Sequence, residues 1–267
     1  MTKIIIAGLT GRMGSRIAAL SYDYEGLELT GAFERAGHKD IGQKISSLIG
    51  VRDNGIILSE RLEDIADRAD VIIDFTAPAA TLHNAGIAAS KKKAMVVGTT
   101  GLSKDDIEAL SSFAKSIPIV FSPNMSVGVN LLLKTLADIS PVLADDFDIE
   151  IIEAHHRLKK DAPSGTAMKI AQVIAEAVKR NLDEVAVYSR KGITGERTKK
   201  EIGIQTVRGG DIVGDHTVMF CGLGERIEIT HKASSRDTFA RGALRAAAWV
   251  KGRQPGLYDM QDVLGLK

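Results

Sequence analysis

The chain has 267 residues, of which 44% are hydrophobic and 4% aromatic, and its formal net charge is +1. A nearly neutral chain provides no global field for nucleic acid or an anionic membrane surface, so an anionic ligand has to be met by a local cluster of cations. A single cysteine, Cys221, excludes a disulfide framework, and no apolar run approaches the roughly 20 residues of a membrane helix. We therefore expect a soluble, cytoplasmic protein with a large aliphatic core.

The first half of the chain alternates between short apolar strands and helical patterns. Strands are predicted at 3–8, 27–34, 55–59, 71–75, 94–100 and 117–122, and helices are clearest at 12–22, 78–90 and 103–115. Near-continuous apolar strands that alternate with helices are typical of a parallel sheet covered on both faces. The sequence therefore predicts an α/β fold with a Rossmann-like, doubly wound parallel sheet in this half.

The second half has a different pattern. A helical stretch at 126–140 is followed by a strand at 148–156, a helix at about 164–180 and a strand-rich region at 186–233. Consecutive strands with glycine-containing turns and no room for helices indicate an antiparallel meander. We predict two domains, a doubly wound one at 1–126 and an α+β one at 127–235 with a mostly antiparallel sheet. The amphipathic helix at 236–252 is expected to return, with the rest of 236–267, to the first domain.

A glycine-rich turn follows the first predicted strand. Gly8, Gly11 and Gly14 have the spacing G-x-x-G-x-x-G, a variant of the dinucleotide fingerprint G-x-G-x-x-G. Such a turn lets the backbone approach a pyrophosphate, which the free N–H groups of a helix N-terminus also bind. Glu34 ends the second strand, where it can accept from a ribose hydroxyl, and the adjacent Arg35 favours a 2′-phosphate instead. The pattern indicates a nicotinamide dinucleotide, with NAD and NADP both open.

Two further loops lie at the ends of predicted strands, at 97–101 and 121–126. Ligands of open α/β sheets bind outside the carboxyl ends of the strands, so both loops are expected at the nucleotide site. The residues concerned are Gly98, Thr99, Thr100, Ser122, Pro123, Asn124 and Met125.

The stretch EAHHRLKKDAPSGTA at 153–167 places two histidines, an arginine and two lysines within six positions. A zinc site is disfavoured because adjacent histidines in a strand point to opposite faces and the only cysteine lies far downstream. Nucleic-acid binding is disfavoured because stacking aromatics are absent. A solvated charge run is the remaining alternative, but it does not explain the helix start that follows.

That helix start offers a place for an anion. The N–H groups of Gly165 and Thr166 lie at the positive end of the predicted helix, where a carboxylate binds favourably. Histidine and lysine nearby can neutralise charge and supply protons, and the candidates are His155, His156, Arg157, Lys159 and Lys160. Beside a nicotinamide domain, the stretch predicts reduction of an anionic, unsaturated substrate that gains a proton, with no metal.

Several motifs resemble one enzyme family from residue 3 to the C-terminus and in order. They include GLTGRMG, VIIDFTAP, VVGTTG, NMSVGVN, EAHHRLKKDAPSGTA and GERIEITHKASSRDTFARGA. The chain is similar to the dihydrodipicolinate reductases, now called 4-hydroxy-tetrahydrodipicolinate reductases, of lysine and diaminopimelate biosynthesis. The resemblance implies NADH- or NADPH-dependent reduction of a cyclic dicarboxylate imine to tetrahydrodipicolinate. It also implies a homotetramer assembled through the sheets of the second domain, which would bind the substrate.

The resemblance also implies roles for individual residues. His155 would act as a proton donor or acceptor and Lys159 as a proton donor, while His156, Gly165 and Thr166 would bind the substrate carboxylates. Glu34 would bind the adenosine ribose and Arg35 would favour a 2′-phosphate. The pyrophosphate would be held by Gly8, Leu9, Thr10, Gly11, Arg12 and Met13, and the nicotinamide side would be lined by Gly98 to Thr100 and Ser122 to Met125.

Two positions depart from the family pattern. Leu158 stands where a histidine is frequent, and Ala77 stands where some members carry arginine or another polar residue. His216 and His231 are interpreted as structural or interfacial, and Arg236 is a candidate hinge or substrate-side residue. A reductase for a different anionic imine or keto acid, and a non-catalytic nucleotide sensor on the same fold, remain as alternatives.

Overall fold

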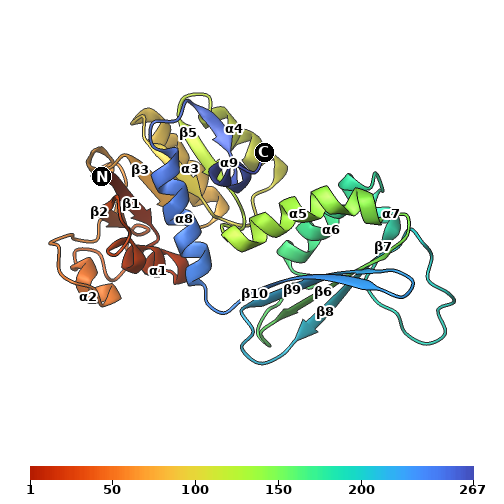
Figure 1. Cartoon of the computed structure of the whole chain (residues 1–267). Helices are drawn as coiled ribbons and strands as arrows, with labels where there is room; N and C mark the ends of the chain where they lie inside the picture. The colour runs from red at the N-terminus through yellow and green to blue at the C-terminus, as the bar shows by residue number, and fades with distance from the viewer. The chain divides into compact units, whose positions relative to one another are not determined.

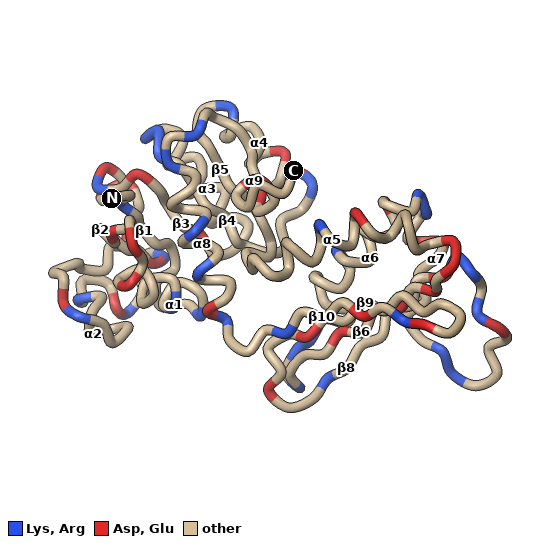
Figure 2. The backbone as a smooth tube through the Cα atoms, in the orientation of Figure 1, with Lys and Arg blue, Asp and Glu red and all other residues tan.

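The computed structural model describes residues 1–267, which divide into two units (Figure 1). Unit 1 comprises Met1–Val127 and Arg236–Lys267, and unit 2 comprises Gly128–Ser235. Basic and acidic residues are interspersed along the backbone of both units (Figure 2). None of the helices is both long and apolar enough to cross a membrane.

Unit 1 contains a six-stranded parallel sheet in the order β11-β5-β4-β3-β1-β2. The strands are β1 (Thr2–Ala7), β2 (Leu27–Phe33), β3 (Val71–Asp74), β4 (Ala94–Val97), β5 (Pro118–Phe121) and β11 (Gly256–Tyr258). The strand order reverses direction beside β1, as in doubly wound folds. The predicted α/β class with a Rossmann-like sheet is therefore confirmed.

Helices cover both faces of this sheet (Figure 1). Along β1, Ile4 and Ile6 pack on one face and Ile5 and Ala7 on the other, because successive strand side chains alternate. The first face packs against α1 (Arg12–Ser21), α2 (Ile45–Ile49), α8 (Asp237–Val250) and α9 (Met260–Leu264). The second packs against α3 (Pro78–Ser90), α4 (Lys104–Phe113) and the 3₁₀ turn η1 (Ala66–Arg68). The near-continuous apolar runs of the strands follow from this double burial.

The predicted strand at 55–59 is wrong. This segment forms only two isolated bridges, Lys44 with Ile57 and Phe33 with Ser59. Its backbone groups are divided between two neighbours, because the N–H of Leu58 donates to Gln43 and the N–H of Ser59 donates to Ala32. No ladder forms when the pairing partner changes within two residues.

Unit 2 contains a five-stranded mixed sheet in the order β10-β9-β6-β8-β7. The strands are β6 (Asp148–His155), β7 (Ala186–Val187), β8 (Ile202–Arg208), β9 (Gly214–Cys221) and β10 (Arg226–Ala233). The predicted meander is wrong, because β6 lies between β8 and β9 and pairs parallel with β8. Only β9 and β10 form a hairpin of consecutive antiparallel strands.

One face of this second sheet is covered by α5 (Val127–Leu143), α6 (Gly165–Ala177) and α7 (Leu182–Val185). Ile149 and Ile151 of β6 point toward these helices and are fully buried. On the opposite face, Ile152 of β6 is 37% exposed and Val207 of β8 is 47% exposed. No helix of unit 2 covers that face. Because Glu153 and His155 alternate with Ile152, they share the covered face.

Candidate functional site

The glycine-rich turn after β1 is built for close approach of backbone. Gly8 has φ +67°, a left-handed conformation that glycine adopts without steric cost. A Cβ atom on Gly14 would lie 2.1 Å from the carbonyl oxygen of Gly8, so only glycine fits where α1 crosses the turn. The N-cap of α1 is Gly11, which supplies no side-chain hydrogen bond. The free N–H groups of the first helical turn therefore remain open to an anion.

Glu34 is buried beside this turn and is hydrogen-bonded to it. Its Oε1 accepts from the backbone N–H of Thr10 at 2.9 Å and from the Thr10 hydroxyl at 2.7 Å. Its Oε2 accepts from the backbone N–H of Arg35 at 3.3 Å. The carboxylate thus links the end of β2 to the turn after β1, the two places where a dinucleotide-binding fold contacts its ligand.

A cavity of about 800 Å³ opens at this edge of the sheet. Five of the predicted nucleotide-binding residues line it, namely Gly8, Thr10, Gly11, Glu34 and Arg35. His38, Ala77, Arg61, Glu60 and Glu63 also line it, so charged side chains of both signs share this edge with Arg35. The size and the position at the carboxyl ends of β1, β2 and β3 suit a nucleotide.

Other predicted nucleotide-binding residues do not line this cavity. Leu9 is fully buried in the core, Met13 packs partly against it, and Arg12 is exposed at the start of α1. The two loops after β4 and β5 lie at the same edge of the sheet, since their strands are parallel to β1. They contain Gly98, Thr99, Thr100, Ser122, Pro123, Asn124 and Met125.

Several of these loop residues have a packing role. Thr99 is buried, and its hydroxyl bonds to the carboxylate of Asp74, which is itself fully buried at the end of β3. A Cβ atom on Gly98 would lie 2.1 Å from the ring of Phe75. Met125 is 1% exposed and belongs to the core. Of the predicted nucleotide-binding residues in the two loops, Thr100 and Pro123 are exposed.

In unit 2, a buried carboxylate organises the residues around His155. Glu153 is fully buried, and its Oε2 lies 2.6 Å from Nδ1 of His155. Arg208 of β8 donates to both carboxylate oxygens, at 2.8 and 2.9 Å. The backbone N–H of Ser164 donates to Oε1 at 3.0 Å, which joins the end of β6 to the start of α6.

Hydrogen bonding keeps this carboxylate ionised. Burial on its own would raise the pKa of Glu153, but the hydrogen bonds from Arg208, His155 and Ser164 lower it to about 2. Burial also lowers the pKa of His155, and the neighbouring Glu153 opposes that shift. The imidazole therefore lies beside a permanent anion in a largely desolvated position.

His216 of β9 packs against the same group. Its ring stands edge-on to that of His155, with centroids 5.2 Å apart, and its Nε2 lies 3.1 Å from the hydroxyl of Ser164. Burial and the positive charge of a protonated His155 lower the pKa of His216 to about 4. His216 is therefore uncharged near neutral pH, and it contacts both His155 and Ser164.

The start of α6 has the geometry that the sequence predicted. Ser164 is the N-cap, and its hydroxyl accepts from the N–H of Ala167 at 3.1 Å. Gly165 is the first helical residue, and a Cβ atom there would meet nothing within 4 Å. The backbone of the first turn is accordingly open on the side of Gly165.

Lys159 and His156 lie in the turn between β6 and α6. The ammonium group of Lys159 lies 2.9 Å from the carboxylate of Asp161, whose side chain is 60% exposed. The positive charge of Lys159 also lowers the pKa of His155, so the two side chains lie within electrostatic reach. Nδ1 of His156 is buried without a hydrogen-bond partner. Such a buried polar atom is costly unless a ligand or water satisfies it.

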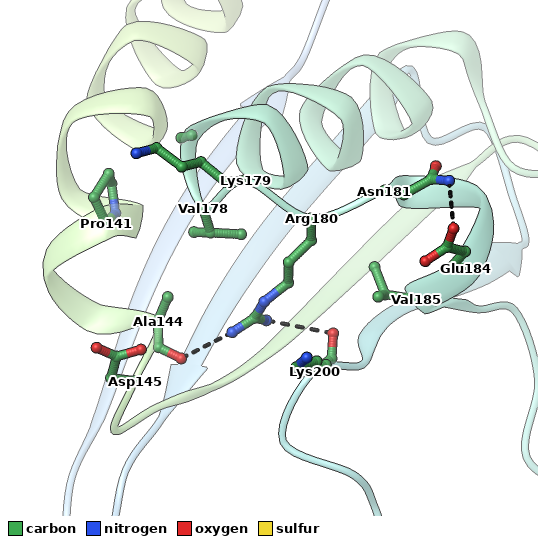
Figure 3. Close-up of a pocket in the computed structure, with 11 residues that line it drawn as sticks. Pro141, Ala144, Asp145, Val178, Lys179, Arg180, Asn181, Glu184, Val185 and Lys200 are labelled. Atoms are coloured by element: carbon green, nitrogen blue, oxygen red, sulfur yellow. Dashed lines mark hydrogen bonds between the residues drawn. The ribbon is translucent and has the colours of Figure 1, made fainter.

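A second cavity, of about 540 Å³, lies in unit 2 and contains none of the predicted site residues (Figure 3). Arg180 crosses it and donates to the carbonyl oxygens of Ala144 and Lys200. These bonds tie the chain after α5 to the segment before β8. We interpret this cavity as a structural junction.

Sequence reasoning missed Glu153 and Arg208 as members of the site. Glu153 stands two residues before His155 in a strand, a spacing that places both side chains on one face. The spacing alone could therefore have identified Glu153. Arg208 lies 55 residues after Glu153, and only the register of β6 with β8 places it beside the carboxylate. No group of three or more His, Cys, Asp or Glu residues is arranged to hold a metal ion.

Comparisons with known proteins agree over the whole chain. The family model described as "Dihydrodipicolinate reductase, N-terminus" matches residues 2–125, and the one described as "Dihydrodipicolinate reductase, C-terminus" matches residues 128–264. A 4-hydroxy-tetrahydrodipicolinate reductase from Syntrophobacter fumaroxidans is 55% identical, and one from Geobacter sulfurreducens is 53% identical, each over 100% of both chains. A solved structure, the dipicolinate-bound dihydrodipicolinate reductase from Paenisporosarcina sp. TG-14, has a TM-score of 0.78 and 25% identity over 98% of each chain. The chain belongs to the dihydrodipicolinate reductase family.

Proposed function

We propose that this protein reduces 4-hydroxy-tetrahydrodipicolinate, by way of dihydrodipicolinate, to tetrahydrodipicolinate in lysine and diaminopimelate biosynthesis. The observation that carries the proposal is the identity of 52–55% over the full chain with relatives named for this reaction. The two units supply the matching parts. Unit 1 has a nucleotide-sized cavity beside a glycine-rich turn, and unit 2 has a cationic, proton-supplying cluster beside a helix start.

Unit 1 is the dinucleotide-binding domain in this proposal. Gly8 to Met13 hold the pyrophosphate through backbone N–H groups at the start of α1, and the tight approach of Gly14 to Gly8 supports that geometry. Glu34 accepts from the adenosine ribose, and Arg35 pairs with a 2′-phosphate when one is present. The loops at 98–100 and 122–125 lie toward the nicotinamide. Bound NADH or NADPH supplies the hydride of the reaction.

Unit 2 is the substrate-binding domain. His156 and the N–H groups of Gly165 and Thr166 bind the two carboxylates, and the unpaired Nδ1 of His156 supports that role. When hydride adds to one end of the conjugated C=C–C=N system, electron density builds at the other end. Lys159, with His155, donates the proton that this end must gain.

Breaking the ion pair between Lys159 and Asp161, so that Lys159 can contact the substrate, costs little free energy. Its partner Asp161 is 60% exposed, and exposed ion pairs contribute only about 0–1 kcal/mol. A dianionic substrate replaces that carboxylate easily, and the ammonium group then turns toward the substrate with its three N–H donors.

We also propose that the protein is a cytoplasmic homotetramer. The support for assembly is the face of the second sheet that no helix of unit 2 covers, where Ile152 and Val207 are 37% and 47% exposed. Apolar side chains on an open sheet face are typical of a surface that packs against another sheet. Light scattering of the purified protein measures the mass, and an Ile152→Glu variant is expected to dissociate.

The test of the reaction is oxidation of reduced nicotinamide, followed by absorbance. Pyruvate and aspartate semialdehyde are condensed in situ to make the substrate, and NADH and NADPH are compared in parallel. Substrate-dependent oxidation supports the proposal, and the ratio of the two rates measures the balance between Glu34 and Arg35. Tight nucleotide binding without oxidation would mean that the cluster from His155 to Thr166 binds another anionic imine or keto acid.

A further inference from the structure

We propose that Glu153 is a positioning residue for proton transfer: it holds His155 as the Nδ1–H tautomer and leaves Nε2 as the ring atom that exchanges a proton with the substrate. The inference rests on the proposed function only for the role of His155. Glu153 belongs to the motif that the sequence analysis singled out, but neither the residue pattern nor the resemblance gave it a role.

The first observation is the hydrogen bonding of the carboxylate. The Oε2 atom of Glu153 lies 2.6 Å from Nδ1 of His155 and accepts a hydrogen bond from Arg208 at 2.8 Å. An ionised carboxylate only accepts hydrogen bonds, so the proton between Glu153 and His155 belongs to Nδ1. Neutral imidazole has one N–H, which leaves a lone pair on Nε2.

The second observation is the glycine beside Nε2. Gly214 of β9 lies next to it, and a Cβ atom on Gly214 would stand 3.0 Å from Nε2. Gly214 does not have a positive φ, so its backbone conformation does not require glycine. A Cβ atom at this distance would be tighter than ordinary van der Waals contact, so the imidazole would have to shift to make room for it. Nδ1 is thus bound by Glu153, while the residue of β9 next to Nε2 carries no side chain.

A second glutamate on the same strand, Glu150, shows how the arrangement at Glu153 differs from an ordinary ion pair. Glu150 of β6 is also bound by arginines, Arg190 and Arg197, at 2.9 to 3.1 Å. That cluster contacts no histidine. Glu153 differs because it touches His155 and, through the N–H of Ser164, the first turn of α6. A single buried anion thus orients the proton-transfer residue and the backbone proposed to bind a carboxylate, as the aspartate of a Ser-His-Asp triad orients its histidine.

The tautomer is measured directly on the full chain with ¹⁵N-labelled histidine. The chain has six histidines, and the signal that disappears in His155→Gln identifies the ring of interest. In the wild-type protein above neutral pH, we expect Nδ1 to carry the proton and Nε2 to be bare. Glu153→Gln is expected to lose this preference, because an amide can donate to Nδ1 as well as accept from it. The control Glu150→Gln is expected to retain it.

The same variants are then compared in the reductase assay. Glu153→Gln is expected to lower kcat about 100-fold, the range of a lost acid–base contribution, with the Kd for the nucleotide unchanged. The limb of the pH profile due to His155 is expected to move to lower pH, because the carboxylate that favours the imidazolium is gone. The other charged or titratable groups that face His155 are Arg208, Lys159 and His216, and all remain in this variant. Glu150→Gln is expected to match the wild type.

Three results would overturn the proposal: a wild-type His155 protonated on Nε2, equal losses in both glutamate variants, or an unchanged kcat in Glu153→Gln. If Glu153→Gln does not fold, the proposal is tested by the tautomer of His155 in the wild type and by the kcat of the Gly214→Ala variant. Gly214→Ala is expected to keep the tautomer and lower kcat at least ~10-fold by obstructing Nε2, and an unchanged kcat would contradict the proposal. The tautomer needs no substrate, so a wild-type protein that fails to oxidise nicotinamide refutes the proposed function without affecting this measurement.

Discussion

The candidate sites of the two units are built from different kinds of chemical group. In unit 1 the turn that lines the cavity presents backbone at Gly8 and Gly11, where side chains are absent, and Glu34 is bonded to this turn. In unit 2 the groups are polar and charged side chains held by other side chains, since Arg208 is bonded to Glu153 and Glu153 to His155. Substitutions in unit 1 are therefore expected to change binding, and those in unit 2 to change turnover.

The first prediction concerns Lys159, the proposed proton donor. Lys159→Ala is expected to lower kcat about 100-fold, because no other ammonium group replaces its proton, and to leave the Kd for the nucleotide nearly unchanged. Lys160→Ala is the matched control, since that exposed lysine belongs to the same stretch and the proposed mechanism does not use it. Turnover is measured by nicotinamide oxidation and affinity by nucleotide fluorescence. Equal losses of turnover and affinity would contradict the role of Lys159.

The second prediction concerns cofactor choice. Arg35 is exposed and lines the cavity, whereas the Glu34 carboxylate is already bonded to Thr10. Arg35→Ala is expected to weaken NADPH binding about 10-fold and NADH binding much less, because only NADPH carries the 2′-phosphate. Lys39→Ala, which changes an exposed cation outside the cavity lining, is the control. A uniform loss for both nucleotides would show that Arg35 binds something other than the 2′-phosphate.

At the scale of elements, local sequence patterns predicted most helices and strands but not all of their pairings. The strands of unit 1 are nearly uniform apolar runs, and burial on both faces makes such runs easy to recognise. The order of the second sheet depends on β6 entering between β8 and β9, a long-range pairing that no local period encodes. For the same reason Arg208 could not be assigned to the site from its own surroundings. β11 was missed because it has only three residues.

The third prediction tests the junction of β1 and α1. Gly14→Ala is expected to destabilise the fold by about 3 kcal/mol, because its Cβ atom would overlap the carbonyl oxygen of Gly8 at 2.1 Å. Gly86→Ala in α3 is the control, since a Cβ atom there meets only the ring of Phe113 at 3.7 Å. The control is expected to gain up to about 1 kcal/mol from helix propensity. Denaturant unfolding measures both, and similar values for the two variants would contradict the steric argument.

At the scale of the whole molecule, ionisable groups are unevenly distributed even though the net charge is +1. Unit 2 buries Glu153, His155 and His216 within one cluster. Unit 1 buries Asp74 among hydroxyl and amide donors from Thr76, Thr81 and Asn84, with no histidine beside it. The acid sensitivity of the fold should therefore reside in the histidine cluster of unit 2, where burial lowers the histidine pKa values.

The last prediction follows from His216. Its pKa in the folded protein is about 4, below the 6.5 of an unfolded histidine, so the unfolded chain binds more protons between these pH values. The stabilisation is fully present above pH 6.5 and is lost as the pH falls toward 4. By pH 5 the loss amounts to roughly 2 kcal/mol. Glu153, with its lowered pKa of about 2, adds a further loss that begins only below pH 4.5.

Denaturant unfolding at pH 8, 6.5 and 5 measures this dependence in the wild type and in His216→Gln. The variant is expected to be less stable at pH 8, because its buried hydrogen bond to Ser164 is weakened, but to lose less stability on acidification. His83→Gln changes an exposed histidine of unit 1 and is expected to follow the wild-type curve at every pH. Parallel curves for the wild type and His216→Gln would place the acid sensitivity at groups other than His216. Convergence of the two curves toward pH 5 would assign it to the buried imidazole, whose neutral state the fold requires.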